Sequence, residues 1–183
     1  ARHFIGTQKH VSGAEIRIEH FPWHRIESKG RPHPHAFSRD GSHVRTATIR
    51  ASRDGAGLRT WITSGLEKLV VLKTSDSAFK DYLRDKYTTL KETDDRIMAT
   101  EVSARWRWSE CDPARLERLD WATSHHAAMT TLLATYADHP SLSLQQTLFA
   151  MGEATLQQQV GIAAIRLSLP NKHHFVVDLS PFG

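Results

Sequence analysis

The sequence contains a single cysteine, Cys111, among 183 residues, so no disulfide can form within the chain. Its fold therefore does not require an oxidising compartment. No apolar run approaches the roughly 20 residues that a bilayer-spanning helix needs, and no secretory signal peptide is visible. Gly-rich phosphate loops, nucleophile elbows and haem motifs are also missing from the sequence. These absences argue against a disulfide-stabilised domain, a protein with membrane-spanning helices and a nucleotide-binding protein with a phosphate loop.

Charge of one sign is not concentrated anywhere along the chain. There are 24 Lys and Arg residues against 20 Asp and Glu residues, and the net charge of +4 is spread out. A nucleic-acid-binding arm would show a basic run, which is not present. The mildly basic surface suits a small anionic substrate, whereas a nucleic-acid partner is disfavoured.

Alternating polar and apolar residues predict several strands. The alternation is clearest at 98–108, where one face carries Met98, Thr100, Val102, Ala104, Trp106 and Trp108. One face of that strand must therefore lie in a core. Residues 39–42 predict a turn between two strand-like segments, because Asp-Gly is a strong turn signal. The other predicted strands are 15–19, 36–38, 44–49, 69–72, 165–169 and 175–179.

Two helices are predicted between the strands 98–108 and 165–169. Asp112-Pro113 is typical of a helix start, and apolar residues at helical spacing follow from Leu116 to Tyr136. A second helix is predicted from Ser143, since Gln146 three residues later completes a capping box.

The elements of residues 61–183 follow the order strand, strand, helix, helix, strand, strand, which defines a second unit. Residues 1–60 show only the closing pair of strands of such a unit. We therefore expect an α+β protein with a tandem repeat whose first unit is incomplete, its opening half lying upstream of Ala1. The chain begins with Ala and not Met, which is expected of a processed start or of part of a longer product.

Two sequence motifs contain side chains that are suited to binding a ligand or to catalysis. Tyr87–Thr100 places a polar, turn-prone segment before a strand and puts Arg96 at the mouth of that strand. An arginine held there can grip a flat anion with two parallel N–H bonds. Residues 170–175 read Pro-Asn-Lys-His-His-Phe. With these motifs the sequence resembles the urate oxidase (uricase) family over nearly its whole length. The resemblance implies the tunnelling fold (T-fold), an antiparallel sheet with helices on one face.

The resemblance also implies a substrate-binding set. In the family a phenylalanine stacks on the purine and an arginine seventeen residues later grips its edge, a spacing that Phe79 and Arg96 have here. Leu144 and Gln145 match the family's helix start, where a backbone N–H and a glutamine contact the ligand. The physical chemistry agrees, because N–H groups in the first turn of a helix favour an anion.

Two catalytic residues are implied in the same way. Asn171 matches the asparagine that faces the oxygen or water site above the ring, and His173 matches a histidine of the family's proton network. The family's catalytic lysine and threonine, and an adjoining aspartate, would lie upstream of Ala1.

The activity implied by the resemblance is oxidation of urate by dioxygen and water to 5-hydroxyisourate and hydrogen peroxide. No cofactor and no metal are expected. The expected assembly is a homo-oligomer, a tetramer with a central tunnel and active sites at subunit interfaces. The expected compartment is the cytoplasm in a bacterium or the peroxisome in a eukaryote.

Three alternatives stay open on the residues alone. His33 and His35 share a strand face, as the zinc ligands of a T-fold pterin enzyme would, but no third ligand is evident nearby. A non-catalytic oligomeric scaffold would also lack the lysine and threonine. Nucleic-acid binding is the weakest alternative. Arg96 itself could form only a surface ion pair with Asp94 or Asp95.

Overall fold

The computed structural model of the chain describes residues 1–39, 41–55, 57–174, 177 and 179–182. Its elements, in chain order, are α1 (Arg2–Thr7), β1 (Gly13–His20), β2 (Trp23–Ser28), β3 (Arg31–Arg39), β4 (Val44–Asp54), β5 (Gly57–Lys73), β6 (Met98–Trp108), α2 (Pro113–Leu116), α3 (Trp121–Asp138), α4 (Leu144–Gln158), β7 (Ile162–Ser168), β8 (Asn171–Lys172) and the 3-10 turn Ser180–Phe182.

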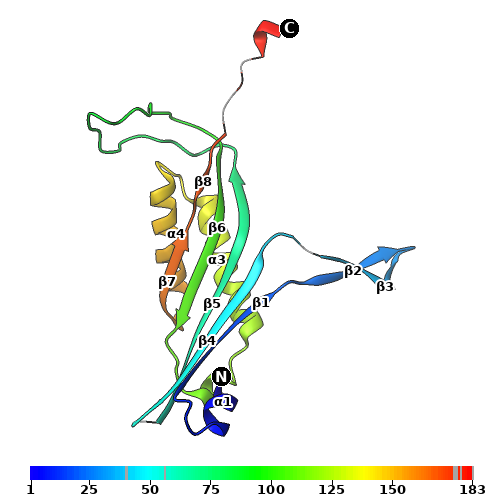
Figure 1. Cartoon of the computed structure of the whole chain (residues 1–183). Coiled ribbons are helices and arrows are strands. Elements are labelled where there is room, and N and C mark those ends of the chain that lie inside the picture. Colours follow the sequence, from blue (N-terminus) through cyan, green and yellow to red (C-terminus); the bar gives the residue numbers. More distant parts are fainter. Residues whose placement is uncertain (40, 56, 175–176, 178, 183) are drawn as a thin grey trace.

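One antiparallel sheet organises the molecule, with the strand order β1-β4-β5-β6-β7 and β8 paired to the start of β6. Helices α3 and α4 pack against each other and against β5 and β7. Figure 1 shows both helices beside the same part of the sheet, and a separate β2–β3 arm that extends away from it. The predicted α+β class, an antiparallel sheet with helices on one face, is confirmed.

Strand β6 forms the centre of the core, as its alternation predicts. Trp106 is fully buried and Trp108 is 6% exposed, so this pair belongs to the core. The helices supply the opposite side of the core through Ala128, Leu132, Tyr136, Leu144 and Met151. Each fully buried large apolar side chain stabilises the fold by about 1.5–3 kcal/mol.

The predicted short strand 69–72 is wrong in its extent. It is the last part of β5, which begins at Gly57 and pairs with β4 as far as Glu67. A β-bulge between Leu66 and Leu69, with Lys68 at a φ of 64°, shifts the register to β6. Val70 and Leu72 are more than half exposed, so the apolar run is not buried on both faces. Because β5 crosses residue 60, the division at 60/61 stays a prediction.

The predicted turn at 39–42 does not join two paired strands. The flanking segments are strands, but β3 pairs with β2 and β4 pairs with β1. Asp40 lies outside the described residues. The tight turn of this region is Lys29-Gly30, where φ values of 56° and 70° suit a two-residue hairpin loop.

The first predicted helix is divided in two. Asp112 caps only the short α2, and α3 begins at Trp121, where the Asp120 carboxylate accepts bonds from the N–H groups of Ala122 and Thr123. This second cap starts a new helix and leaves Leu119 between the two, 37% exposed. The predicted start of α4 is confirmed, since Ser143 Oγ accepts a bond from the N–H of Gln146.

The predicted closing strand 175–179 is not formed at the positions that the structure describes. Pairing with β6 ends at Lys172, opposite Ala99. Val177 and Leu179 lie in no strand and are exposed, and Phe175 lies outside the described residues.

Candidate functional site

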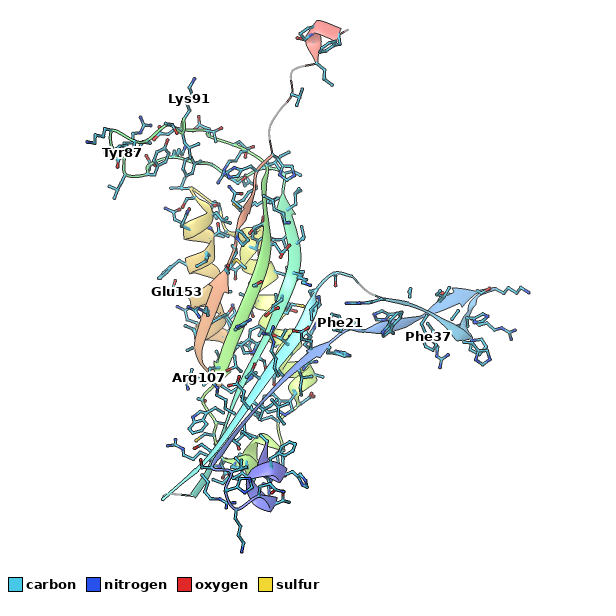
Figure 2. All side chains as sticks on the ribbon, in the orientation of Figure 1. Phe21, Phe37, Tyr87, Lys91, Arg107 and Glu153 are labelled. Atoms are coloured by element: carbon cyan, nitrogen blue, oxygen red, sulfur yellow. The ribbon has the colours of Figure 1, made fainter. Side chains whose placement is uncertain are left out.

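Residues from four segments meet where β6 begins. The first two are the ends of a long loop between β5 and β6, which Figure 2 shows extending outward with Tyr87 near its tip. The loop is closed at its base by Phe79 and Thr93, which exchange backbone bonds with N···O distances of 2.8 and 3.0 Å. These two backbone hydrogen bonds to Thr93 therefore fix the position of Phe79.

The same loop base is attached to the segment before α4. The N–H of Ala78 donates to the carbonyl of Ser141 at 2.7 Å, and the N–H of Lys80 donates to the carbonyl of Leu142 at 3.4 Å. The fourth segment is β8, where Asn171 pairs with Thr100 of β6. All six residues predicted for the site thus lie on segments joined at one end of the sheet.

Arg96 and Phe79 are in direct contact. The guanidinium carbon of Arg96 lies 5.4 Å from the centroid of the Phe79 ring. Its Nε donates to the carbonyl of Ala78 at 3.4 Å, which orients the planar group. In the described part of the chain, no hydrogen bond or ion pair occupies its two terminal nitrogens. Two parallel donors thus remain for a ligand.

Burial lowers the pKa of Arg96, because the surrounding protein removes water from the guanidinium group. The group still carries its charge at neutral pH, since guanidinium groups stay protonated in proteins. A partly desolvated charge attracts an anion more strongly than one in bulk water.

The surface ion pair that could have explained Arg96 is not formed. Asp94 pairs with Lys80 at 3.0 Å. Asp95 accepts bonds from two backbone groups, the N–H of Arg96 at 3.0 Å and that of Ser77 at 3.2 Å. The Ser77 hydroxyl, which is buried, donates to the carbonyl of Arg96. These bonds fix the backbone of Arg96 and leave its side chain available.

Helix α4 presents its start beside this cluster. Leu144 is 7% exposed, whereas Gln145 is exposed. Ser143 caps the third residue, so the N–H groups of Leu144 and Gln145 are left as donors. The Gln145 side chain lines a separate hollow of about 480 Å³ with His139 and Phe149. No hydrogen bond among the described residues joins it to Arg96.

Asn171 and His173 form a second pair. The Nδ2 of Asn171 lies 3.4 Å from the Nδ1 of His173. Asn171 is half-buried and His173 is exposed. The Thr100 hydroxyl donates to the carbonyl of Pro170 at 2.9 Å, which holds the start of β8 against β6. β7 and β8 both pair antiparallel with β6, so the chain keeps its direction through Pro170 and the reversal expected before Asn171 is not formed.

Sequence reasoning missed two residues of the cluster. Tyr82 stacks on Phe79 with ring centroids 4.3 Å apart and an interplanar angle of 21°. Ser77 holds the carbonyl of Arg96. The spacing of two aromatic residues three positions apart was a signal for the first, but nothing in the sequence marked Ser77.

Histidine pairs do not assemble a metal site in the described residues. The N–H of His35 donates to Nδ1 of His33 at 3.2 Å. No group of three or more His, Cys, Asp or Glu residues arranged to hold a metal ion occurs in the part of the chain that the structure describes.

A family model described as "Uricase" matches residues 1–50 and 62–183. The chain belongs to the uricase family. It is 43% identical over 182 residues to a uricase of Arthrobacter globiformis, covering 100% of this chain and 56% of the relative. It is 39% identical over 185 residues to a uricase of Aspergillus flavus, covering 97% of this chain and 59% of the relative.

Solved uricase structures share the fold. The crystal structure of uricase from Arthrobacter globiformis matches with a TM-score of 0.85 and 42% identity, over 99% of this chain and 58% of that one. A uricase from Bacillus fastidious matches at 17% identity with a TM-score of 0.76, over 91% of this chain and 53% of that one, which shows the fold alone. The chain therefore has the T-fold, as the resemblance implied.

The chain spans a little over half the length of these uricases, 56% and 59% of the two relatives compared. Uricases similar to it come from bacteria and from eukaryotes. Among the described residues, no helix has the length and apolar character required to span a bilayer.

Proposed function

We propose that this chain forms part of a urate oxidase, which oxidises urate with dioxygen and water to 5-hydroxyisourate and hydrogen peroxide without a cofactor. Urate is a planar anion with donors and acceptors around its rim. The protein's contribution to such a reaction is positioning and electrostatic stabilisation.

The Arg96–Phe79 contact is the observation that carries this proposal. The guanidinium carbon of Arg96 lies 5.4 Å from the centroid of the Phe79 ring, and the two terminal nitrogens of that planar group are unpaired in the described part of the chain. A flat anion uses both groups, since its face stacks on the ring and its edge accepts two charge-assisted bonds. In this proposal the guanidinium moves from above the Phe79 ring to the edge of the ligand, while Tyr82 supports the other face of the ring.

The remaining predicted residues take complementary roles. The N–H groups of Leu144 and Gln145, at the positive end of α4, attract the anion, and the Gln145 amide reaches its opposite edge. Asn171 faces the oxygen or water side, and His173 at 3.4 Å from it moves protons. Both roles rest on the family resemblance and on the closeness of these two side chains.

The proposal extends to assembly and compartment. Residues 1–60 represent the end of a first T-fold unit and residues 61–183 a second one. The protein forms a homo-oligomer, a tetramer in which neighbouring subunits complete each site. Its compartment is the cytoplasm in a bacterial host or the peroxisome in a eukaryotic one.

Urate binding and urate oxidation should be measured separately, because the chain covers 56% of the length of its Arthrobacter globiformis relative. Binding is followed by calorimetry, and turnover by oxygen uptake in the presence of a strong chelator. Arg96→Ala should weaken urate binding by at least about 100-fold, because it removes two charge-assisted hydrogen bonds worth about 1.5 kcal/mol or more each.

Lys91→Ala is the control, because it removes the same charge from an exposed residue of the same loop. That variant should bind urate as the parent does. Normal affinity in Arg96→Ala would refute the clamp, and chelator-sensitive oxygen uptake would refute the cofactor-free reaction.

A further inference from the structure

The sheet face opposite the helices carries a hollow of about 910 Å³ in the described part of the chain. Five arginines and one glutamate line it, together with two threonines and the apolar residues Trp61, Ala164 and Ile165. The charged lining residues are Glu15, Arg17, Arg50, Arg105, Arg107 and Arg166. Figure 2 labels Arg107 on β6, near the end of the strand that points away from the long loop.

The strand register places like charges beside one another. Arg105 on β6 lies directly opposite Arg166 on β7, so both side chains project from the same face. Arg107 lies opposite Ala164, which makes it the diagonal neighbour of Arg166. Directly opposed side chains have Cβ atoms about 5 Å apart, and like charges at that separation destabilise a sheet.

Acidic neighbours neutralise only part of this charge. Glu67 lies 2.7 Å from Arg105 and 3.2 Å from Arg17. Glu15 pairs with Arg50. Arg107 and Arg166 have no hydrogen bond or ion pair within the described residues, and both are exposed. Two uncompensated cations therefore face the hollow from adjacent strands.

Short side chains of β4 and β5 lie beside the arginines of β6. Gly65 lies opposite Arg105 from the β5 side, and Thr63 lies opposite Arg107. Thr48 pairs with Thr63 on the same face and also lines the hollow. Hydroxyl groups can donate to an anion, so Thr48 and Thr63 add neutral donors to the arginines.

We propose that this hollow binds a small oxyanion with two or more negative charges, held by Arg107 and Arg166 and assisted by Arg105. Arginine forks match phosphate and carboxylate oxygens bidentately. The bound anion would offset the repulsion between the opposed arginines.

This site is separate from the one proposed for urate. Arg96 precedes β6 and Arg107 lies near its end, so about 35 Å of strand separates them at ~3.3 Å per residue. The two sites can therefore be tested independently of each other.

The test is calorimetric titration of the chain with inorganic tripolyphosphate at constant ionic strength. Arg107→Gln and Arg166→Gln should each weaken binding at least about tenfold, since each removes a charge-assisted contact. Arg115→Gln is the matched control, because it removes the same charge from an exposed residue outside the hollow that pairs with Glu110. That control should bind tripolyphosphate as the parent does.

A second readout separates anion binding from a purely structural role. Without the anion, Arg166→Gln should raise the melting temperature, because it relieves repulsion from Arg105. Tripolyphosphate should raise the melting temperature of the parent and much less that of the variant. Equal affinity in parent and both hollow variants would overturn the proposal. A second result would also overturn it: single-stranded RNA binds more tightly than tripolyphosphate, and Arg115→Gln weakens RNA binding as much as the two hollow variants do.

Discussion

At the scale of single residues, Asp95 sets the position of Arg96 without pairing with its guanidinium group. Its carboxylate accepts bonds from the N–H groups of Arg96 and Ser77, at 3.0 and 3.2 Å. Removing it leaves two backbone donors without their partner and frees the turn before β6. The side chain that grips the ligand would then have to be ordered on binding.

Asp95→Ala should therefore weaken urate binding by about tenfold, a change of about 1.4 kcal/mol, although Asp95 is not expected to contact urate. Asp94→Ala is the control, because Asp94 is 93% exposed and pairs only with Lys80 among the described residues. Calorimetry of both variants checks this prediction. Equal affinities in the two would mean that Asp95 does not position the arginine.

His125 on α3 is a buried titratable side chain. It is 5% exposed, and its Nε2–H donates to the carbonyl of Gly65 at 3.1 Å. Its ring lies beside Trp106 and stacks over His43. Burial lowers the pKa of His125 from 6.5 to about 4, and the nearby charges of Arg45, His43 and His126 act in the same direction.

This shift makes folding stability depend on pH. Between pH 6.5 and 4 the unfolded chain binds a proton at this position and the folded chain does not, so the free energy of unfolding falls as pH falls. We expect a loss of about 2 kcal/mol between pH 7 and pH 5, measured by urea denaturation. His125→Gln should show a smaller decrease over that range. A variant that loses as much stability as the parent would assign the pH dependence to other groups.

At the scale of secondary-structure elements, Gly65 lets β5 and β6 approach closely beneath α3. A Cβ at this position would collide with the carbonyl oxygen of Ala104 and lie 2.9 Å from the Thr46 hydroxyl. Neither neighbour can move freely, since the backbone carbonyl belongs to β6 and Thr46 is buried.

Gly65→Ala should therefore lower the free energy of unfolding by about 1–3 kcal/mol, the usual cost of overpacking. Gly6→Ala is the matched control, because no atom lies within 4 Å of the added Cβ and the residue is in α1. That change should be neutral or stabilise by up to about 1 kcal/mol. Equal stability in both variants would show that the sheet adapts at Gly65.

Several elements could be predicted from sequence because their signals are local. The boundaries of β6 and the Ser143 cap of α4 follow from alternation and capping, which depend on neighbouring residues only. The two-part helix at 113–138 was missed because Asp120 looked like one polar position within an apolar repeat. The long β5 was missed because its bulge at Lys68 breaks the alternation.

At the scale of the whole molecule, the two predicted units share one sheet. Strands β4 and β5 pair without interruption from Val44–Glu67 to Asp54–Gly57, across the predicted division at 60/61. Strand β5 then pairs with β6 in the core of the second unit. Loss of either side exposes backbone groups and apolar surface of the other.

We therefore expect a single cooperative unfolding transition. Urea denaturation followed by tryptophan fluorescence should coincide with the transition seen by far-UV circular dichroism. Trp61 reports on β5, while Trp106 and Trp108 report on the core. Two separated transitions would show instead that residues 1–60 unfold independently.

The sequence by itself determined the class of fold, the order of the main elements and the spacing of Phe79, Arg96 and Gln145, since these depend on periodicity and motif. Only the tertiary structure decided that the Arg96 guanidinium does not pair with Asp94 or Asp95 and that Tyr82 stacks on Phe79. It also decided that Arg105 opposes Arg166. The physical reason is that these contacts join positions distant in sequence, and their geometry depends on strand register and loop closure.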